Sequence, residues 1–148
     1  MRGSTRRITA LSALAALTLA LSGCAKVHEG GGEAEKAATV EKIGDGSQQR
    51  VVLIEAAAKR LGIETTPVAK LDDQHETVPY SAVIYDAEGH SWVFTTSDPL
   101  AYVKAPITID HIDGDRAILT AGPPVGTQVV TQGAEELFGV EDGIGEFE

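Results

Sequence analysis

The feature that most constrains this chain is an uncharged apolar run over residues 8–21, preceded by three arginines and followed by small residues and a cysteine. A basic segment, a short apolar segment and small residues at a cut site are typical of a secretory signal peptide. The run has 14 residues, counted from 8 to 21, fewer than the roughly 20 that span a bilayer as a helix. The sequence therefore predicts export rather than a membrane-spanning helix.

The residues at the end of this run, Leu21-Ser22-Gly23-Cys24, resemble the lipobox of bacterial lipoproteins at all four positions. The resemblance implies removal of residues 1–23, a diacylglyceryl thioether on Cys24 and acylation of its amine. Two or more acyl chains give a stable anchor where one would not, at about 0.8 kcal/mol per buried methylene. We therefore expect a membrane-anchored, extracytoplasmic lipoprotein on the cell surface or periplasmic face. The alternatives are an ordinary signal peptide that is cut elsewhere and an apolar helix that is not cleaved.

The mature chain would have 148 − 23 = 125 residues, enough for one domain. Its one cysteine is Cys24, which the lipid would consume, so no disulfide is available to the fold. Removing Arg2, Arg6 and Arg7 leaves 9 basic against 22 acidic residues, a net charge of −13 instead of −10. A charge of this sign argues against nucleic acid and against docking on anionic lipid headgroups.

Residues 24–49 have the composition of a flexible tether. Three consecutive glycines at 30–32 lead into a stretch rich in Glu, Ala and Lys, and the apolar residues are sparse and unpatterned. Such a segment is expected to behave as a random coil that spans about 25–30 Å. His28 has no second metal-ligand residue at a suitable spacing, so we interpret it as a solvated side chain.

Residues 50–139 carry the patterns of one folded domain. The β-branched run at 51–54 predicts a strand. Residues 55–61 predict a two-turn helix, because Glu stands in the first turn, Lys and Arg stand in the last, and Gly62 follows. Residues 63–71 predict another strand, in which Pro67 marks an edge or a bulge.

The rest of the domain reads as short strands joined by turns, followed by one short helix and a disordered acidic tail at 140–148. The pattern is typical of a mainly β fold, a small antiparallel β-barrel or sandwich with one or two short helices. Pro106 indicates two strands, or one strand with a bulge, between residues 100 and 112. The remaining predicted elements are strands at 80–85, 91–95, 116–120 and 127–131 and a helix at 134–138 that Gly139 ends.

A second resemblance rests on an ordered set of motifs: Val-Pro-x-x-Ala-Val at 78–83, Trp-Val-Phe at 92–94, a Gly-Asp turn at 114–115, Gly-x-x-x-Gly at 122–126 and Gly-Ala-x-x-Leu at 133–137. The set resembles the membrane-proximal domain of periplasmic adaptor subunits, also called membrane fusion proteins, of resistance-nodulation-division and related efflux systems. The stretch at 51–68, with Arg-Leu-Gly-Ile-Glu-Thr at 60–65, is similar to the start of such adaptors.

The family places a β-barrel, a lipoyl-like domain and a helical hairpin between these two pieces, whereas only residues 69–77 join them here. The resemblance implies a non-enzymatic, lipid-anchored accessory subunit of an efflux transporter, with the transporter or a full-length adaptor as its partner. Without the missing parts the chain would not bridge a tripartite pump alone. The loop containing Pro123 and Pro124 is a candidate contact. The alternative is a free-standing lipoprotein that binds a small ligand or a metal.

We expect no catalytic, cofactor or metal residues. No nucleophile elbow surrounds Ser91 beside His90. Asp110, Asp113 and Asp115 do not have the spacing of an EF-hand loop, and Asp-Gly is a common turn dipeptide.

The histidines could share a metal only if the fold brought them together; they are His28, His75, His90 and His111.

We expect the larger aromatic side chains to serve packing rather than ligand stacking. These residues are Tyr85, Trp92, Phe94 and Tyr102.

Overall fold

The structure, a computed structural model, describes residues 36–46 and 48–143. The predicted signal peptide, the lipidation site Cys24, His28 and residues 144–148 of the predicted tail lie outside the described residues. In the part of the chain that is described, no helix is long and apolar enough to cross a membrane.

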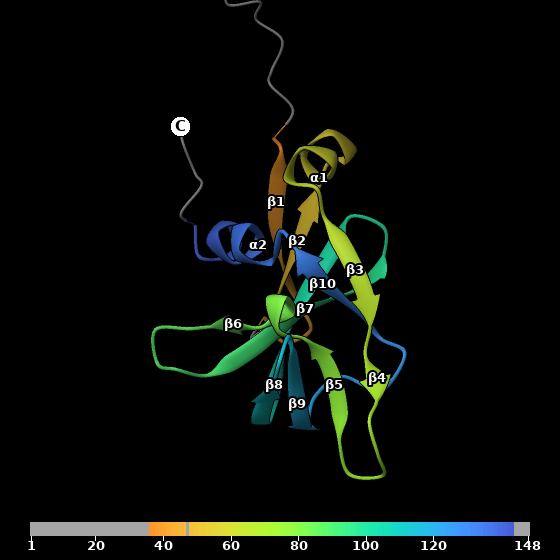
Figure 1. The fold of residues 1–148 in the computed structure, drawn as a ribbon. Helices are drawn as coiled ribbons and strands as arrows, with labels where there is room; N and C mark the ends of the chain where they lie inside the picture. The colour runs from red at the N-terminus through yellow and green to blue at the C-terminus, as the bar shows by residue number, and fades with distance from the viewer. Residues whose placement is uncertain (1–35, 47, 144–148) are drawn as a thin grey trace, which may run out of the picture. The chain divides into compact units, whose positions relative to one another are not determined.

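The fold is mainly β, with two short helices, as predicted (Figure 1). The described residues form the following elements in chain order: β1 (Ala38–Ile43), β2 (Gln48–Leu53), α1 (Glu55–Leu61), β3 (Glu64–Pro67), β4 (Ala69–Lys70), β5 (Glu76–Pro79), the 3-10 turn η1 (Tyr80–Ala82), β6 (Ile84–Tyr85), β7 (Ser91–Asp98), β8 (Ala101–Asp113), β9 (Arg116–Ala121), β10 (Gln128–Gln132) and α2 (Ala134–Glu141).

Seven strands form a nearly closed antiparallel barrel in the order β3-β10-β7-β8-β9-β5-β4. The two strands at the ends of this order are halves of one segment, because only Val68 separates β3 from β4. Val68 N–H donates to the Thr127 carbonyl at 2.8 Å, and its own carbonyl accepts Gly126 N–H at 2.9 Å. The strand predicted at 63–71 is therefore divided at Val68 into β3 and β4. These two strands stand at opposite ends of the strand order, so the segment that contains them closes the barrel and covers the edges at both ends.

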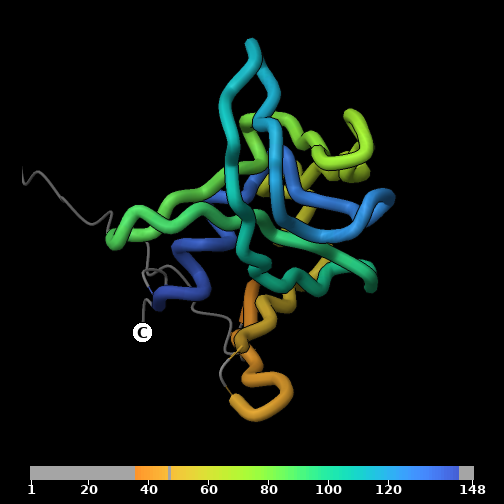
Figure 2. The backbone as a smooth tube through the Cα atoms, turned by 90° about the horizontal axis from the view of Figure 1, so that it is seen from below, coloured from red at the N-terminus to blue at the C-terminus, as the bar shows by residue number. Residues whose placement is uncertain are grey.

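Strand β8 connects the two halves of the barrel. It pairs with β7 along its first half and with β9 along its second. The register with β9 shifts between Thr108 and His111, just beyond Pro106. Of the two predicted alternatives, the structure has one strand with an irregular register. The hairpin of β8 and β9 extends beyond the rest of the barrel, and so does the hairpin of β6 and β7 (Figure 2).

The interior divides into two hydrophobic clusters because neighbouring residues of a strand point to opposite faces. Phe94 and Val130 belong to the first cluster, whereas their neighbours Val93 and Val129 belong to the second. All four are fully buried. Helix α2 packs against the first cluster through Leu137, which is also fully buried. The helix is therefore attached to the hydrophobic core and not only to the surface of the barrel.

The prediction for residues 55–62 is confirmed. Helix α1 spans Glu55–Leu61, and Gly62 follows it in the left-handed region at φ 64°. Gly62 N–H donates to the Lys59 carbonyl at 3.2 Å, which caps the last turn.

The prediction that the tether extends to residue 49 is wrong. Residues 38–43 form β1, which pairs in regular antiparallel register with β2, and β2 begins at Gln48 rather than at residue 51. Thr39 and Val40 lie opposite Val52 and Val51 in this pairing. The Glu, Ala and Lys composition concealed the strand, because β1 gains its stability from these cross-strand neighbours rather than from its own propensity.

Two further predictions are corrected. The strand predicted at 80–85 is a 3-10 turn followed by the two-residue strand β6, because the chain turns directly after Pro79. Helix α2 continues through Gly139 to Glu141, so the first residues of the predicted tail are helical. Glu141 lies 2.8 Å from Lys104 of β8, and this tertiary contact helps to offset the cost of a glycine inside a helix.

Candidate functional site

The hairpin of β6 and β7 brings together three side chains of types that can bind a metal ion. Ligand atoms of Asp86, Glu88 and His90 lie within 4.8 Å of one another. The carboxylate of Asp86 is already engaged, because Oδ1 accepts N–H of Glu88 at 3.1 Å and N–H of His90 at 2.7 Å. Oδ2 accepts Trp92 Nε1–H at 3.0 Å and lies 3.0 Å from His90 Nδ1.

These bonds decide the protonation of Asp86. Its partial burial raises the pKa, but the hydrogen bonds from Trp92 and His90 outweigh burial and lower the pKa to about 2. A metal ion would have to displace donors that now hold the turn in place. The Asp86 carboxylate therefore serves to stabilise the turn through these hydrogen bonds. The sequence predicted a turn at residues 86–89, which the hydrogen bond from Gly89 N–H to the Asp86 carbonyl confirms, but it did not identify Asp86 as a candidate ligand.

The other two described histidines each pair with a neighbouring aspartate. His75 Nδ1 lies 2.9 Å from Asp72 Oδ2, and His111 Nδ1 lies 2.7 Å from Asp110 Oδ2. The hydrogen bond to Asp72 is the main cause that raises the pKa of His75. Among the described residues, no group of three candidate metal ligands includes either histidine, so the fold does not gather them.

The acidic residues near the tip of the β8–β9 hairpin also have separate contacts. Asp113 pairs with Arg116 at 2.9 Å, and the carbonyl of Asp115 accepts Tyr80 N–H at 2.7 Å. In residues 36–46 and 48–143 neither they nor Asp110 belong to a group of candidate metal ligands.

A cleft of about 470 Å³ lies beside α2, and Lys104 is one of the residues that line it. Lys104 Nζ lies 5.1 Å from the ring centre of Trp92, 4.9 Å from that of Phe138 and 2.8 Å from Glu141 Oε2. The Glu141 side chain is only 8% exposed, and its contact with Nζ is ionic rather than a well-angled hydrogen bond. The residues that line the cleft are Gln48, Gln49, Trp92, Lys104, Pro106, Glu141 and Asp142.

The cleft combines an aromatic ring, a cation and two acids, which is the composition of a polar ligand site rather than of an apolar one. Gln49 Oε1 is buried in its wall without a hydrogen-bond partner in the described part of the chain. The sequence prediction that aromatic residues serve packing holds for Phe94 and Tyr102, which are buried in the first cluster. It is incomplete for Trp92, which also lines this cleft, and wrong for Tyr85, whose side chain is 47% exposed.

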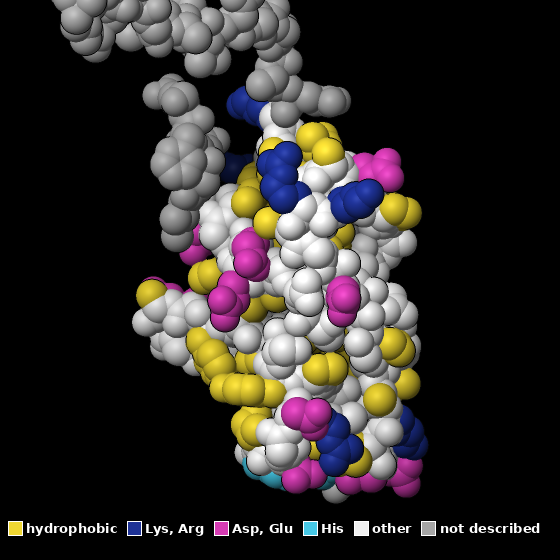
Figure 3. Space-filling model, turned by 45° about the horizontal axis from the view of Figure 1, so that its top comes forward, with side chains coloured by type: hydrophobic (Ala, Val, Ile, Leu, Met, Phe, Trp, Pro, Cys, Tyr) yellow, Lys and Arg dark blue, Asp and Glu magenta, His cyan; other side chains and the backbone are white. Residues whose placement is uncertain are grey.

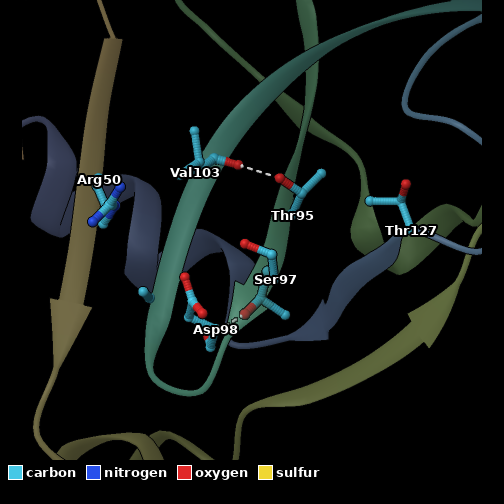
Figure 4. A pocket seen from close by; sticks show the side chains of 8 residues that line it. Arg50, Thr95, Ser97, Asp98, Val103 and Thr127 are labelled. Carbon is cyan, nitrogen blue, oxygen red and sulfur yellow. Dashed lines mark hydrogen bonds between the residues drawn. The ribbon is translucent and has the colours of Figure 1, made fainter. Parts of the chain in front are cut away.

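A smaller pocket of about 110 Å³ lies between β2, β7 and β8 (Figure 4). Arg50 lies on one side of it and the side chains of Thr95, Ser97 and Asp98 on the other (Figure 4). Thr95 Oγ1 donates to the Val103 carbonyl at 3.1 Å, so this hydroxyl is already used by the barrel. The pocket has room for a few waters, at roughly 30 Å³ each.

An exposed aromatic pair lies where η1 meets β6. The side chains of Tyr80 and Tyr85 are 43% and 47% exposed. Desolvation of its hydroxyl, together with the interaction with Tyr80, raises the pKa of Tyr85. Figure 3 shows hydrophobic side chains gathered on the lower left of one face, in the region of these two elements. Tyrosines that are exposed in this way are typical anchors of protein interfaces.

Comparisons with known protein families, with curated proteins and with solved structures return no match.

Proposed function

We propose that this chain is a non-enzymatic, lipid-anchored accessory subunit of an efflux transporter. In this proposal Cys24 holds the protein on the extracytoplasmic side of a membrane. The β-barrel corresponds to the membrane-proximal domain of a periplasmic adaptor that lacks the lipoyl-like and hairpin parts.

One observation carries the proposal: the two segments that resemble opposite ends of an adaptor chain build a single barrel. From the first segment, β2 pairs with β8 and β3 pairs with β10. Residues 69–77, which contain β4 and the loop before β5, join the first segment to the second, and the barrel closes without any inserted domain. A chain of this kind would keep the end of an adaptor that faces a transporter and lose the end that reaches an outer-membrane channel.

Two exposed surfaces are candidates for the contact with a transporter. The Tyr80–Tyr85 pair offers two aromatic rings with hydroxyl groups, which suits a protein interface better than a purely apolar patch would. In the loop named from the sequence, Pro123 is buried and Pro124 is exposed, so this loop offers a contact mainly through Pro124 and the 52% exposed Val125. Of the two, the tyrosine pair presents the larger side chains.

The experiment is co-purification of the full-length, tagged chain from native membranes in a gentle detergent, with mass spectrometry of its partners. We expect a transporter or a full-length adaptor in stoichiometric amounts. A Tyr80→Ser, Tyr85→Ser double variant should lose the partner, whereas Leu71→Ser, which changes a residue of similar exposure elsewhere on the surface, should keep it. Recovery of the protein without any transport component would contradict the proposal.

Membrane attachment is tested separately with Cys24→Ser. This variant should be exported and soluble, because it lacks the thiol that the lipid requires. A Cys24→Ser chain that stays in the membrane fraction would refute the anchor while leaving the contact with a transporter open to the first experiment.

The cleft beside Lys104 supports a second candidate function, the binding of a small polar ligand by a free-standing lipoprotein. Its volume lies in the range of ligand sites, and Trp92, the chain's only tryptophan, lies in its wall. A ligand of the folded state would raise the melting temperature by mass action and change the Trp92 fluorescence. Screening compound mixtures by these two signals would favour this function if both responded to the same compound and Lys104→Met removed the response.

A further inference from the structure

Strand β1 leaves one long edge unpaired in the part of the chain that the structure describes. It pairs only with β2, whereas the segment that contains β3 and β4 closes the rest of the barrel. The strand has six residues in unbroken register and contains neither proline nor a bulge, two of the features that protect an edge. Within residues 36–46 and 48–143 nothing pairs with this edge, so its main-chain groups form a candidate site for another strand.

The hydrogen bonds of β2 show which residues of β1 face outward. Ile54 N–H donates to the Ala37 carbonyl at 3.1 Å, so Ala37 faces β2. Hydrogen-bonded and non-hydrogen-bonded pairs alternate in an antiparallel ladder. Thr39 and Glu41 consequently also face β2, and the N–H and C=O groups of Ala38, Val40 and Lys42 point away from the barrel.

These three outward-facing residues are complementary to themselves about a two-fold axis at Val40. A second β1, antiparallel to the first, would place Val40 opposite Val40 and Ala38 opposite Lys42, so that every outward N–H and C=O finds a partner. An axis at Glu41 would put two glutamates opposite each other and leave Ala38 unpaired, which is unfavourable. The register centred on Val40 is thus the one that the edge prefers.

The side chains support the same arrangement. Val40 lies opposite Val51 of β2, which is fully buried, and therefore stands on the face of the sheet that carries the first hydrophobic cluster. Yet Val40 itself is 40% exposed, because the cluster ends at this edge. Pairing about Val40 would extend the apolar face across the axis and bury this side chain. Glu41 on the opposite face lies 3.8 Å from Arg50, which partly neutralises it.

We propose that β1 is a homodimerisation edge, at which two copies of this chain pair antiparallel about Val40 and join their sheets into one. The occupant is a second copy, because the edge matches itself in main-chain register and brings the two Val40 side chains together. This inference does not depend on the proposed attachment to a transporter.

The test is disulfide cross-linking of the full-length chain with a cysteine introduced in β1. In the proposed register two Val40→Cys chains bring their Cα atoms to about 5.5 Å, within the range that a disulfide bridges. Lys42→Cys is the matched control, because four residues of offset separate the two copies of position 42 by about 14 Å. The unmodified chain shows any background from Cys24. We expect mild oxidation to yield at least ten times more dimer with Val40→Cys than with Lys42→Cys.

A proline variant tests the same edge without a new thiol. Val40→Pro removes an outward N–H that β2 does not use, so the chain should fold and remain monomeric in native mass spectrometry where the unmodified chain forms dimers. Glu41→Pro removes an N–H that bonds β2 and should instead lower the melting temperature. Equal cross-linking at positions 40 and 42, cross-linking of Val40→Cys only to a different protein, or no cross-linking would each overturn the proposal.

Discussion

Leu137→Ala is the substitution that best tests how α2 is held on the barrel. Leu137 is fully buried in the first hydrophobic cluster, and α2 carries both Phe138 and Glu141, which contact Lys104 of the cleft. If the helix docks through this leucine, its truncation should destabilise the whole domain and disturb the cleft at the same time. Leu71→Ala is a matched control, because the same three carbon atoms are removed from a side chain that is 44% exposed.

The expected loss follows from the atoms that are removed. Three buried carbon groups at about 0.8 kcal/mol each give about 2.4 kcal/mol, and the cavity that remains brings the total to about 3 kcal/mol. For a domain of roughly 100 residues the unfolding entropy near the midpoint is about 0.2 kcal/mol per degree, so the melting temperature should fall by about 15 °C. The Leu71→Ala control should lose less than about 1 kcal/mol.

The assay is thermal unfolding followed by circular dichroism and by fluorescence. Trp92 is the only tryptophan in the chain and lies in the cleft, so its emission reports on the surroundings of α2. We expect one cooperative transition by both probes, shifted by the same amount in Leu137→Ala. A shift no larger than that of Leu71→Ala, or a loss of the Trp92 signal well before the β-sheet signal, would refute the view that this leucine fastens the helix to the core.

Three further outcomes are expected. The pKa of Asp86 is lowered to about 2, so its contribution to stability is complete above the unfolded pKa near 3.9 and is lost as the pH falls from about 4 to 2. In chemical denaturation, the free energy of unfolding of Asp86→Asn should not show this fall. The pKa of His75 is raised, so its contribution to stability is complete below pH 6.5 and is lost as the pH rises through the pKa of the folded state. His75→Gln should flatten this part of the plot of unfolding free energy against pH. An unchanged plot would contradict the pairing with Asp72. Gly133→Ala should lower the free energy of unfolding by about 1–3 kcal/mol in denaturant titrations, because Gly133 has φ 85° and its Cβ would collide with Ile63 Cδ1; a neutral effect would contradict that geometry.

The mainly β class and the first helix followed from local signals in the sequence. Glu55, the basic last turn and Gly62 define α1 through interactions within one or two turns, which is why its bounds were predicted correctly. The short runs of β-branched residues and the Gly and Pro turns likewise identified most strands, because alternation and turn chemistry are properties of neighbouring residues.

What only the tertiary structure decided depends on residues that are distant in the sequence. β1 is a strand because β2 lies beside it, and α2 reaches Glu141 because Lys104, 37 positions earlier, offers its ammonium group. The barrel closes at Val68 because its main chain meets Thr127, and the cleft exists only where β2, β7, β8 and α2 converge. Such contacts form only when the chain folds back on itself, so no local pattern of residues can encode them.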